Sequence, residues 1–338
     1  MIALACLALA LDLVFADPKS LPHPVQGIGF LAGRLETHAR RLGAARGAPV
    51  LAGALACLAL CLLSASLAAL ACRLPSFLGS LAALYLAWSG LALGGLVREG
   101  KSALARIRDA EKDSSTLPAA RHAVQMLVSR DTSAMLTDEL YRSLAESLSE
   151  NLNDAFVAPF FWLCLTGPAG LWFHKTASTL DSMWGYRNER WRDFGKTAAR
   201  LDDALAFIPA RLSAALMLLT AWLEHTARRI RGLPPRPLTP AFDGDFFQTP
   251  GWPGYATISR QARACSSPNA GWPMAAAAWL FHGKSGGPTP YDGIMAQKPL
   301  LGPEKGRWQR ENCRLLLLHV RNTGIVCALI ALAFAGIV

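Results

Sequence analysis

Long apolar stretches, each of a length that suits a lipid bilayer, divide the chain. Residues 50–71 and 76–97 are each uncharged over 22 positions, which lets a helix cross about 30 Å of hydrocarbon. The short break at 73–75 predicts a helical hairpin, and the small residues in both stretches favour close packing. Residues 1–16 and 320–338 complete a set of four predicted transmembrane helices.

Two further apolar stretches are less regular. Residues 155–173 contain Pro159 and Gly167-Pro168, and residues 204–223 contain Pro209 and Arg211 near the middle. Proline removes a helical hydrogen bond, and a charge at mid-bilayer is costly. We therefore expect re-entrant or protein-buried broken helices here rather than simple spans.

The segment between the hairpin and the last apolar stretch is more polar. Residues 119–129 and 137–152 have the periodicity of amphipathic helices, strand signals are almost absent, and residues 232–254 form a predicted loop rich in Pro and Gly. The predicted fold is an all-α, multi-pass integral membrane protein. Its predicted parts are N-terminal membrane helices (1–97), a helical catalytic body with membrane-adjacent helices (98–314) and a C-terminal transmembrane helix (315–338).

Composition and charge narrow the class of protein. Charged residues make up only 17% and the net charge is +10, whereas soluble domains carry about 25% charged residues. The excess charge suits an anionic membrane surface or substrate. The basic residues are scattered among apolar runs, so we expect no nucleic-acid partner. The eight cysteines form no CxxC pair and are expected to be buried small hydrophobes.

Basic residues also predict orientation. They are concentrated in 34–46 and 98–142, whereas the turn of the hairpin holds only Arg73. By the positive-inside rule these two segments and the body at 98–314 lie on the cytoplasmic side of an inner membrane, and both chain ends lie outside.

The carboxylates are grouped. Glu146, Glu150 and Asp154 are spaced four apart, which places them on one face of a helix, and this face leads into the apolar residues 155–173. Like charges at this spacing repel one another. The arrangement favours a cation site, such as Mg²⁺ with a nucleotide, over an exposed acidic face.

Other polar motifs follow the same segments. Lys175 and Asp181 lie within two turns of a helix that Gly185 is expected to end, and Asp17 and His23 lie on a turn fixed by prolines. Ser267 and Asn269 precede a helix of small residues, which predicts either a phosphate site or only a helix cap. The segment His282-Gly283-Lys284-Ser285 resembles the end of a P-loop but lacks the preceding strand and glycine.

Taken in order, the motifs resemble the CobD/CbiB family, the adenosylcobinamide-phosphate (cobinamide) synthases of cobalamin biosynthesis, over nearly the whole chain. The resemblance rests on Asp17-Pro18, Pro22-His23-Pro24-Val25, Arg130-Asp131-Thr132, Glu150-Asn151, Asp154, Ala158-Pro159, Thr179-Leu180-Asp181-Ser182-Met183, Gly185-Tyr186, Ala199-Arg200-Leu201-Asp202-Asp203, Pro209-Ala210-Arg211, Ser267-Pro268-Asn269-Ala270-Gly271-Trp272-Pro273 and Gly286-Gly287-Pro288.

The resemblance implies a membrane enzyme that joins aminopropanol, or its phosphate, to a propionate carboxylate of adenosylcobyric acid and consumes ATP with Mg²⁺. Membrane lipid and other membrane enzymes of cobalamin assembly are the further partners it implies. The catalytic residues would be Glu150, Asp154, Lys175, Asp181, Asp202, Asp203 and Arg211, with Glu150, Asp154 and Asp181 also as metal ligands and Asp181 or Asp202 as the partner of Arg211. The substrate-binding residues would be Asp17, His23, Arg130, Asp131, Asn151, Ser182, Tyr186, Arg200, Ser267 and Asn269.

Four positions depart from the family pattern. Ser178 stands where the family usually has Asn, Cys265 where it has His, Met274 where it has an acid, and Ala155 where it has Gly. Methionine neither binds Mg²⁺ nor accepts a proton, so the Met274 departure matters most for activity.

Two other functions compete with the synthase. One is a non-enzymatic, AmpE-like regulatory membrane protein, which resembles this chain in hydropathy but lacks most of the polar motifs. The other is a membrane transporter or scaffold, which broken helices and an intramembrane arginine would suit.

Overall fold

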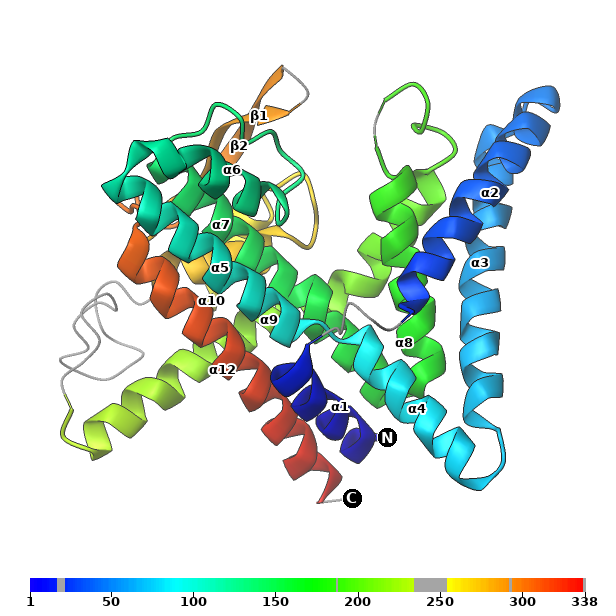
Figure 1. Cartoon of the computed structure of the whole chain (residues 1–338), viewed down its shortest axis with the longest axis horizontal. Coiled ribbons are helices and arrows are strands. Elements are labelled where there is room, and N and C mark those ends of the chain that lie inside the picture. Colours follow the sequence, from blue (N-terminus) through cyan, green and yellow to red (C-terminus); the bar gives the residue numbers. More distant parts are fainter. Residues whose placement is uncertain (17–21, 187, 234–253, 292–293, 337–338) are drawn as a thin grey trace. The chain divides into compact units, whose positions relative to one another are not determined.

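The computed structural model describes residues 1–16, 22–186, 188–233, 254–291 and 294–336 (Figure 1). In these residues the chain is almost entirely helical. The helices are α1 (Ile2–Phe15), α2 (Pro24–Ala45), α3 (Pro49–Cys72), α4 (Ser76–Gly90), α5 (Leu93–Lys112), the short η1 (Ser114–Thr116), α6 (Leu117–Gln125), α7 (Thr137–Leu152), the π-helical turn η2 (Asn153–Val157), α8 (Ala158–Trp184), α9 (Lys196–Ile230), α10 (Tyr255–Ala262), α11 (Gly271–Leu280) and α12 (Arg310–Ala335). Strands β1 (Ser285–Tyr291) and β2 (Ile294–Leu301) form an antiparallel hairpin.

The helices belong to two compact units built from discontinuous segments. Unit 1 comprises Met1–Gly94, Asp154–Pro209 and Ile330–Val338, and unit 2 comprises Gly95–Asn153 and Ala210–Leu329. These units cut across the three consecutive regions expected from hydropathy, because α9 and α12 each contribute to both. The membrane-based division at 97 and 314 stays a prediction.

Five helices are long and apolar enough to cross a membrane, as judged by length and composition in the part of the chain that the structure describes. They are Pro49–Cys72, Phe77–Lys112, Thr137–Trp184, Lys196–Ile230 and Arg310–Ala335, of which the second takes in α4 and α5 together and the third takes in α7, η2 and α8. The all-α, multi-pass membrane fold is thereby confirmed. Helix α1 is the exception among the four predicted spans: its 14 residues rise only about 21 Å.

The expectation of one uninterrupted helix over 76–97 is wrong. Helix α4 ends at Gly90 and α5 begins at Leu93. The break frees backbone groups that a continuous helix would pair internally. The Ala92 N–H instead donates to the carbonyl of Ala155, in the π-helical turn, at 2.9 Å.

The two apolar stretches predicted to be broken differ from each other. Helix α8 is kinked as expected at Gly167, whose φ of 73° is not helical. Helix α9, by contrast, is continuous through Pro209. Proline at 209 leaves the carbonyl of Leu205 without its helical donor, and the Trp162 indole N–H donates to that carbonyl at 3.1 Å. A side chain from α8 thus replaces the lost helical bond.

The core of unit 1 lies between α2, α3, α8 and the start of α9. Its buried members are Ala32, Ala56, Cys57, Leu60, Cys61, Ala177, Leu180, Trp184, Phe194 and Ala198. Small residues bring the backbones close: a Cβ on Gly53 would lie 1.9 Å from the Phe194 carbonyl oxygen. The predicted burial of the cysteines as small hydrophobes is confirmed for Cys57, Cys61, Cys313 and Cys327, whereas Cys6, Cys72, Cys164 and Cys265 are only half-buried.

Unit 2 contains α7, α10, α11 and the β-hairpin, with α11 packed against α7 and both strands. Helix α7 begins and ends where the sequence predicts, at Thr137 and Leu152, with Asp138 and Glu139 in its first turn. The hairpin was not expected, because its strands hold four glycines and prolines in β1 alone. The predicted loop 232–254 lies almost entirely outside the described residues.

Candidate active site

Four aspartates, three of them on α8 and α9, form a group in unit 1, which we call the carboxylate cluster. Asp181 lies near the end of α8, Asp202 and Asp203 lie near the start of α9, and Asp154 lies in the π-helical turn before α8. The charges of Asp154 and Asp203 act on Asp181, and those of all three other members act on Asp202. The structure therefore brings together four of the seven predicted catalytic residues.

The side chain of Ser178 completes the cluster by donating a hydrogen bond to the Asp202 carboxylate. The two residues come from different helices, so this bond fixes the Asp202 side chain relative to α8. Sequence reasoning named Ser178 only as a departure from the family pattern. The departure could have pointed to this role, because the Ser178 hydroxyl can donate to a carboxylate just as the side-chain amide of the usual Asn can.

The absence of a side chain at Gly185 leaves room for the Asp181 carboxylate. Helix α8 ends at Trp184, and the Gly185 N–H donates to the Asp181 carbonyl at 2.7 Å, which confirms the predicted helix end. A Cβ on Gly185 would lie 2.0 Å from Oδ1 of Asp181. The carboxylate can hold its observed place only because residue 185 has no side chain.

The predicted acidic face of Glu146, Glu150 and Asp154 does not continue as expected. The α-helical periodicity ends at Leu152, and the wider π-helical turn Asn153–Val157 follows. Turns of this kind are frequent at functional sites. Glu146 is 2% exposed whereas Asp154 is exposed, and Asp154 lies beyond the end of α7, so the three acids do not share one regular α-helix.

The predicted metal set of Glu150, Asp154 and Asp181 is not assembled within one unit, since Glu150 belongs to unit 2. Within the described ranges, no three His, Cys, Asp or Glu side chains are arranged to hold a metal ion. Magnesium commonly uses only one or two carboxylates and completes its shell with water and substrate phosphates. The all-oxygen donors of the carboxylate cluster suit that chemistry.

Unit 2 holds a second set of predicted polar residues, arranged around a buried ion pair. Arg130 Nη1 lies 2.6 Å from Glu146 Oε2, and these side chains are 6% and 2% exposed. The other oxygen of Glu146 accepts the Gly286 N–H at 2.8 Å. Arg130 is thus engaged inside the fold, and its role in substrate binding stays a prediction.

The charge of Glu146 in this ion pair acts on Cys265, which stands where the family usually has His. Burial raises the pKa of its thiol; Lys298 lowers it, and Glu150 and Glu146 raise it. Met274, the other notable departure, lies half-buried in α11.

The geometry at the start of α11 favours a helix cap over a phosphate site. Ser267 Oγ accepts the N–H groups of Asn269 and Ala270, at 3.3 and 3.2 Å, which is the geometry of a helix-leading turn. Asn269 is 6% exposed. Phosphate binding by these two residues stays a prediction.

Arg211, placed in the catalytic set by resemblance, contacts an aromatic side chain of α11. Its guanidinium carbon lies 4.7 Å from the centroid of the Trp272 ring, and the Tyr255 hydroxyl donates to the Arg211 carbonyl at 3.3 Å. A cation over an indole face is a favourable contact. Arg211 belongs to unit 2 and the suggested partners Asp181 and Asp202 to unit 1, so that pairing stays a prediction.

The remaining predicted substrate residues are scattered. His23 caps α2, its Nδ1 accepting the Val25 N–H at 3.2 Å. Asp131 is exposed and accepts from the Ser133 N–H and hydroxyl, which lowers its pKa. Lys175 and Asn151 are half-buried, Ser182, Tyr186 and Arg200 are exposed, and Asp17 lies outside the described residues.

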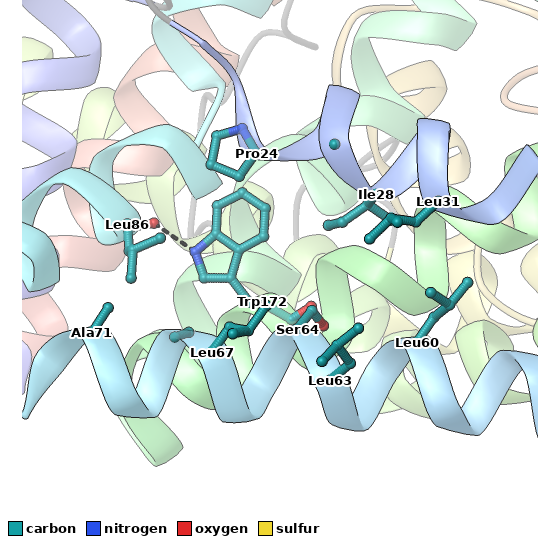
Figure 2. A pocket seen from close by; sticks show the side chains of 12 residues that line it. Pro24, Ile28, Leu31, Leu60, Leu63, Ser64, Leu67, Ala71, Leu86 and Trp172 are labelled. Atoms are coloured by element: carbon teal, nitrogen blue, oxygen red, sulfur yellow. Dashed lines mark hydrogen bonds between the residues drawn. The ribbon is translucent and has the colours of Figure 1, made fainter. Parts of the chain in front are cut away.

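An apolar pocket of about 340 Å³ lies elsewhere in unit 1, between α2, α3, α4 and α8. Figure 2 shows the Trp172 ring against Pro24 at one end, with its N–H donating to the Leu86 carbonyl at 3.0 Å. Ser64 is the single hydroxyl in a lining that is otherwise apolar apart from that indole N–H. The pocket contains none of the predicted catalytic residues, so its chemistry does not suit the reaction site.

Comparison with known proteins places the chain in a family. A profile described as CobD/CbiB protein matches residues 5–318. A protein of Pelobacter propionicus named cobalamin biosynthesis protein CobD is 34% identical over 98% of this chain and 94% of its own. Proteins of the same name from Klebsiella pneumoniae (34% identical; 88% and 86% covered) and Leptospira interrogans (30%; 96% of each) are also similar. No solved structure matches. The chain belongs to the CobD/CbiB family.

Proposed function

We propose that this protein is a cobalamin biosynthesis enzyme of the inner membrane that converts adenosylcobyric acid to adenosylcobinamide or its phosphate. The reaction joins a corrin propionate carboxylate to the amine of aminopropanol or of its phosphate, forming an amide. Two findings support the proposal: family membership over residues 5–318, and relatives named for cobalamin biosynthesis that match nearly end to end.

The observation that carries the proposal is the carboxylate cluster itself. Four carboxylates from α8, α9 and the π-helical turn act on one another in a partly buried place. Mutual repulsion makes such a cluster unfavourable unless it holds a cation or a proton. A membrane protein that used these residues only for folding would gain nothing from the repulsion.

The proposed reaction needs two things from the carboxylate cluster: ligands for a cation and an acceptor for a proton. When bound, Mg²⁺·ATP supplies the activation that an unreactive carboxylate needs before an amine can displace oxygen from it. Asp181 and Asp202 would hold the cation through their oxygens. A neighbouring carboxylate, Asp154 or Asp203, would accept the proton that the amine loses as the amide forms.

Family membership also bears on the competing functions. The AmpE-like regulatory protein was distinguished by lacking most of the polar motifs, and this chain keeps them. The continuity of α9 through Pro209 removes one of the two broken helices that suited a transporter.

The test is a product assay on the full chain, purified in detergent. The protein is incubated with adenosylcobyric acid, ATP and Mg²⁺, and with either aminopropanol or its phosphate, and corrinoid products are measured by mass spectrometry. We expect one amide product, formed together with equal amounts of ADP and inorganic phosphate, which carries away the displaced carboxylate oxygen. Asp202→Asn, which keeps the shape of the side chain, should abolish the product.

Complementation of a bacterial mutant unable to make cobinamide provides the cellular readout. Wild-type protein should rescue growth and Asp202→Asn should not, at equal membrane abundance. Failure of an abundant wild-type protein in both assays would remove the synthase proposal. Product formation without ATP consumption would remove its ligase part.

A further inference from the structure

The β-hairpin and the start of α7 enclose a pocket of about 480 Å³ in unit 2, which we call the hairpin pocket. Three cationic side chains line it, each from a different segment: Arg142 from α7, Lys284 from the residues before β1, and Arg307 from the residues before α12. The carboxylate cluster lies in unit 1 and shares no residue with it.

The charges of two of these cations are not neutralised inside the protein. Across the ranges that the structure describes, neither Lys284 nor Arg307 takes part in an ion pair. The Arg142 guanidinium donates from its two terminal nitrogens to the carbonyls of Gly286 and Pro288, at 3.0 and 3.3 Å, and these neutral partners leave its charge in place. Three positive charges around one cavity attract an anion.

Two carboxylates, Asp138 and Glu139, also line the hairpin pocket. Glu139 is engaged, because it accepts the Leu136 N–H at 3.1 Å at the start of α7. Both acids are exposed, so water screens their charges. They reduce the positive field at one side of the pocket without pairing with Lys284 or Arg307.

The backbone beside the cations is held in conformations that most residues avoid. His282 has a φ of 50°, and Gly286 and Gly287 have φ values of 83° and 81°. A Cβ at Gly283 would lie 2.1 Å from the Trp308 ring, and one at Gly286 would lie 1.9 Å from the Pro299 carbonyl oxygen. Backbone held in this way is concentrated at ligand sites.

Side chains of the fold fix this segment from both sides. The Trp308 indole N–H donates to Ser285 Oγ at 3.0 Å in a buried place, and Glu146 accepts the Gly286 N–H. Lys284 stands between these anchors, so its backbone position is determined before any ligand arrives. Such preorganisation lowers the cost of binding.

We propose that the hairpin pocket binds a phosphate ester, with Lys284, Arg307 and Arg142 contacting the phosphate oxygens. Which ester it takes rests on the proposed function, which has two phosphate-bearing substrates: ATP and the phosphate of aminopropanol. The presence of three cationic side chains around the pocket does not depend on the proposed function.

The test is calorimetric titration of the full chain in detergent micelles, without corrinoid, with ATP in one arm and 1-amino-2-propanol O-phosphate in the other. Lys284→Ala and Arg307→Ala should each weaken the binding of one ligand by about tenfold or more. Lys284→Gln serves as a second variant that keeps the length of the side chain, and a melting curve checks the fold of each protein.

The matched control is Lys305→Ala. Lys305 is exposed and lies two residues before Arg307, but it does not line the hairpin pocket, so its loss removes the same charge from the same segment and should leave binding unchanged. The arm that responds identifies the ester. The proposal is wrong if the wild-type protein binds neither ligand. It is also wrong if the Lys284 and Arg307 variants bind both ligands as tightly as wild type does.

The result of this binding test can be distinguished from the result of the synthase assay. Phosphate-ester binding that depends on Lys284, in a protein that makes no amide product, would support the hairpin pocket and remove the synthase. Amide formation with unaltered kinetics in the Lys284 and Arg307 variants would do the reverse.

Discussion

Arg130 and Glu146 form a buried ion pair, with Nη1 and Oε2 2.6 Å apart. Arg130→Ala would leave the Glu146 charge buried without its partner, so we expect the free energy of unfolding to fall by about 3–5 kcal/mol. Denaturant unfolding in mixed micelles measures it.

An exposed ion pair supplies the control. Arg314 Nη2 and Glu311 Oε1 are also 2.6 Å apart, but these side chains are 54% and 56% exposed. Arg314→Ala should cost only about 0–1 kcal/mol. Equal losses for the two variants would contradict the importance of burial.

The Ser178 hydroxyl holds Asp202, and this predicts how position 178 can vary. Ser178→Ala removes the donor to the carboxylate, so we expect kcat to fall by about tenfold. Ser178→Asn restores an N–H donor and should recover most of that loss. Thr166→Ala, on the same helix and with its hydroxyl donating to the Trp162 carbonyl, should act as wild type. An alanine variant that keeps full activity would show that this bond is dispensable.

Gly185 leaves room for the Asp181 carboxylate, so a single methyl group should displace it. We expect Gly185→Ala to lower activity strongly and to raise the Mg²⁺ concentration that gives half-maximal rate, because the added Cβ would lie 2.0 Å from Oδ1. Gly33→Ala is the matched change, since nothing lies within 4 Å of its Cβ position. An unchanged Mg²⁺ dependence in Gly185→Ala would show that Asp181 does not bind the metal.

Cys265 should react slowly with alkylating reagents. Burial raises the pKa of its thiol above the ordinary range, and the thiolate is the reactive form. The rate of iodoacetamide labelling, followed at this peptide by mass spectrometry, should therefore still rise with pH above about 8.5. Lys298→Ala should slow labelling further, because Lys298 lowers that pKa, and Lys305→Ala should not. A rate that levels off near pH 7 would contradict the raised pKa.

Local pattern alone determined a large part of the fold. The uncharged residues 50–71 predict α3 almost to its ends, the first-turn acids at 138 and 139 mark the start of α7, and Gly185 marks the end of α8. These features depend on neighbours within one or two helical turns, so sequence is sufficient to find them. The aspartates of the carboxylate cluster were likewise named from their motifs.

Tertiary contacts decided what local pattern could not. Pro209 predicts a broken helix, yet Trp162 supplies the missing donor from α8; an uncharged run predicts one helix over 76–97, yet Ala92 bonds to Ala155 instead. The grouping of Asp181 with Asp202 and Asp203 joins residues that are distant along the chain, and so does the hairpin pocket. Sequence by itself determined the hydrophobic segments, the family motifs and the ends of helices such as α7 and α8, because these follow from local periodicity and caps. Only the tertiary structure decided which charges act on one another, because electrostatic and hydrogen-bonding partners are chosen by distance in space.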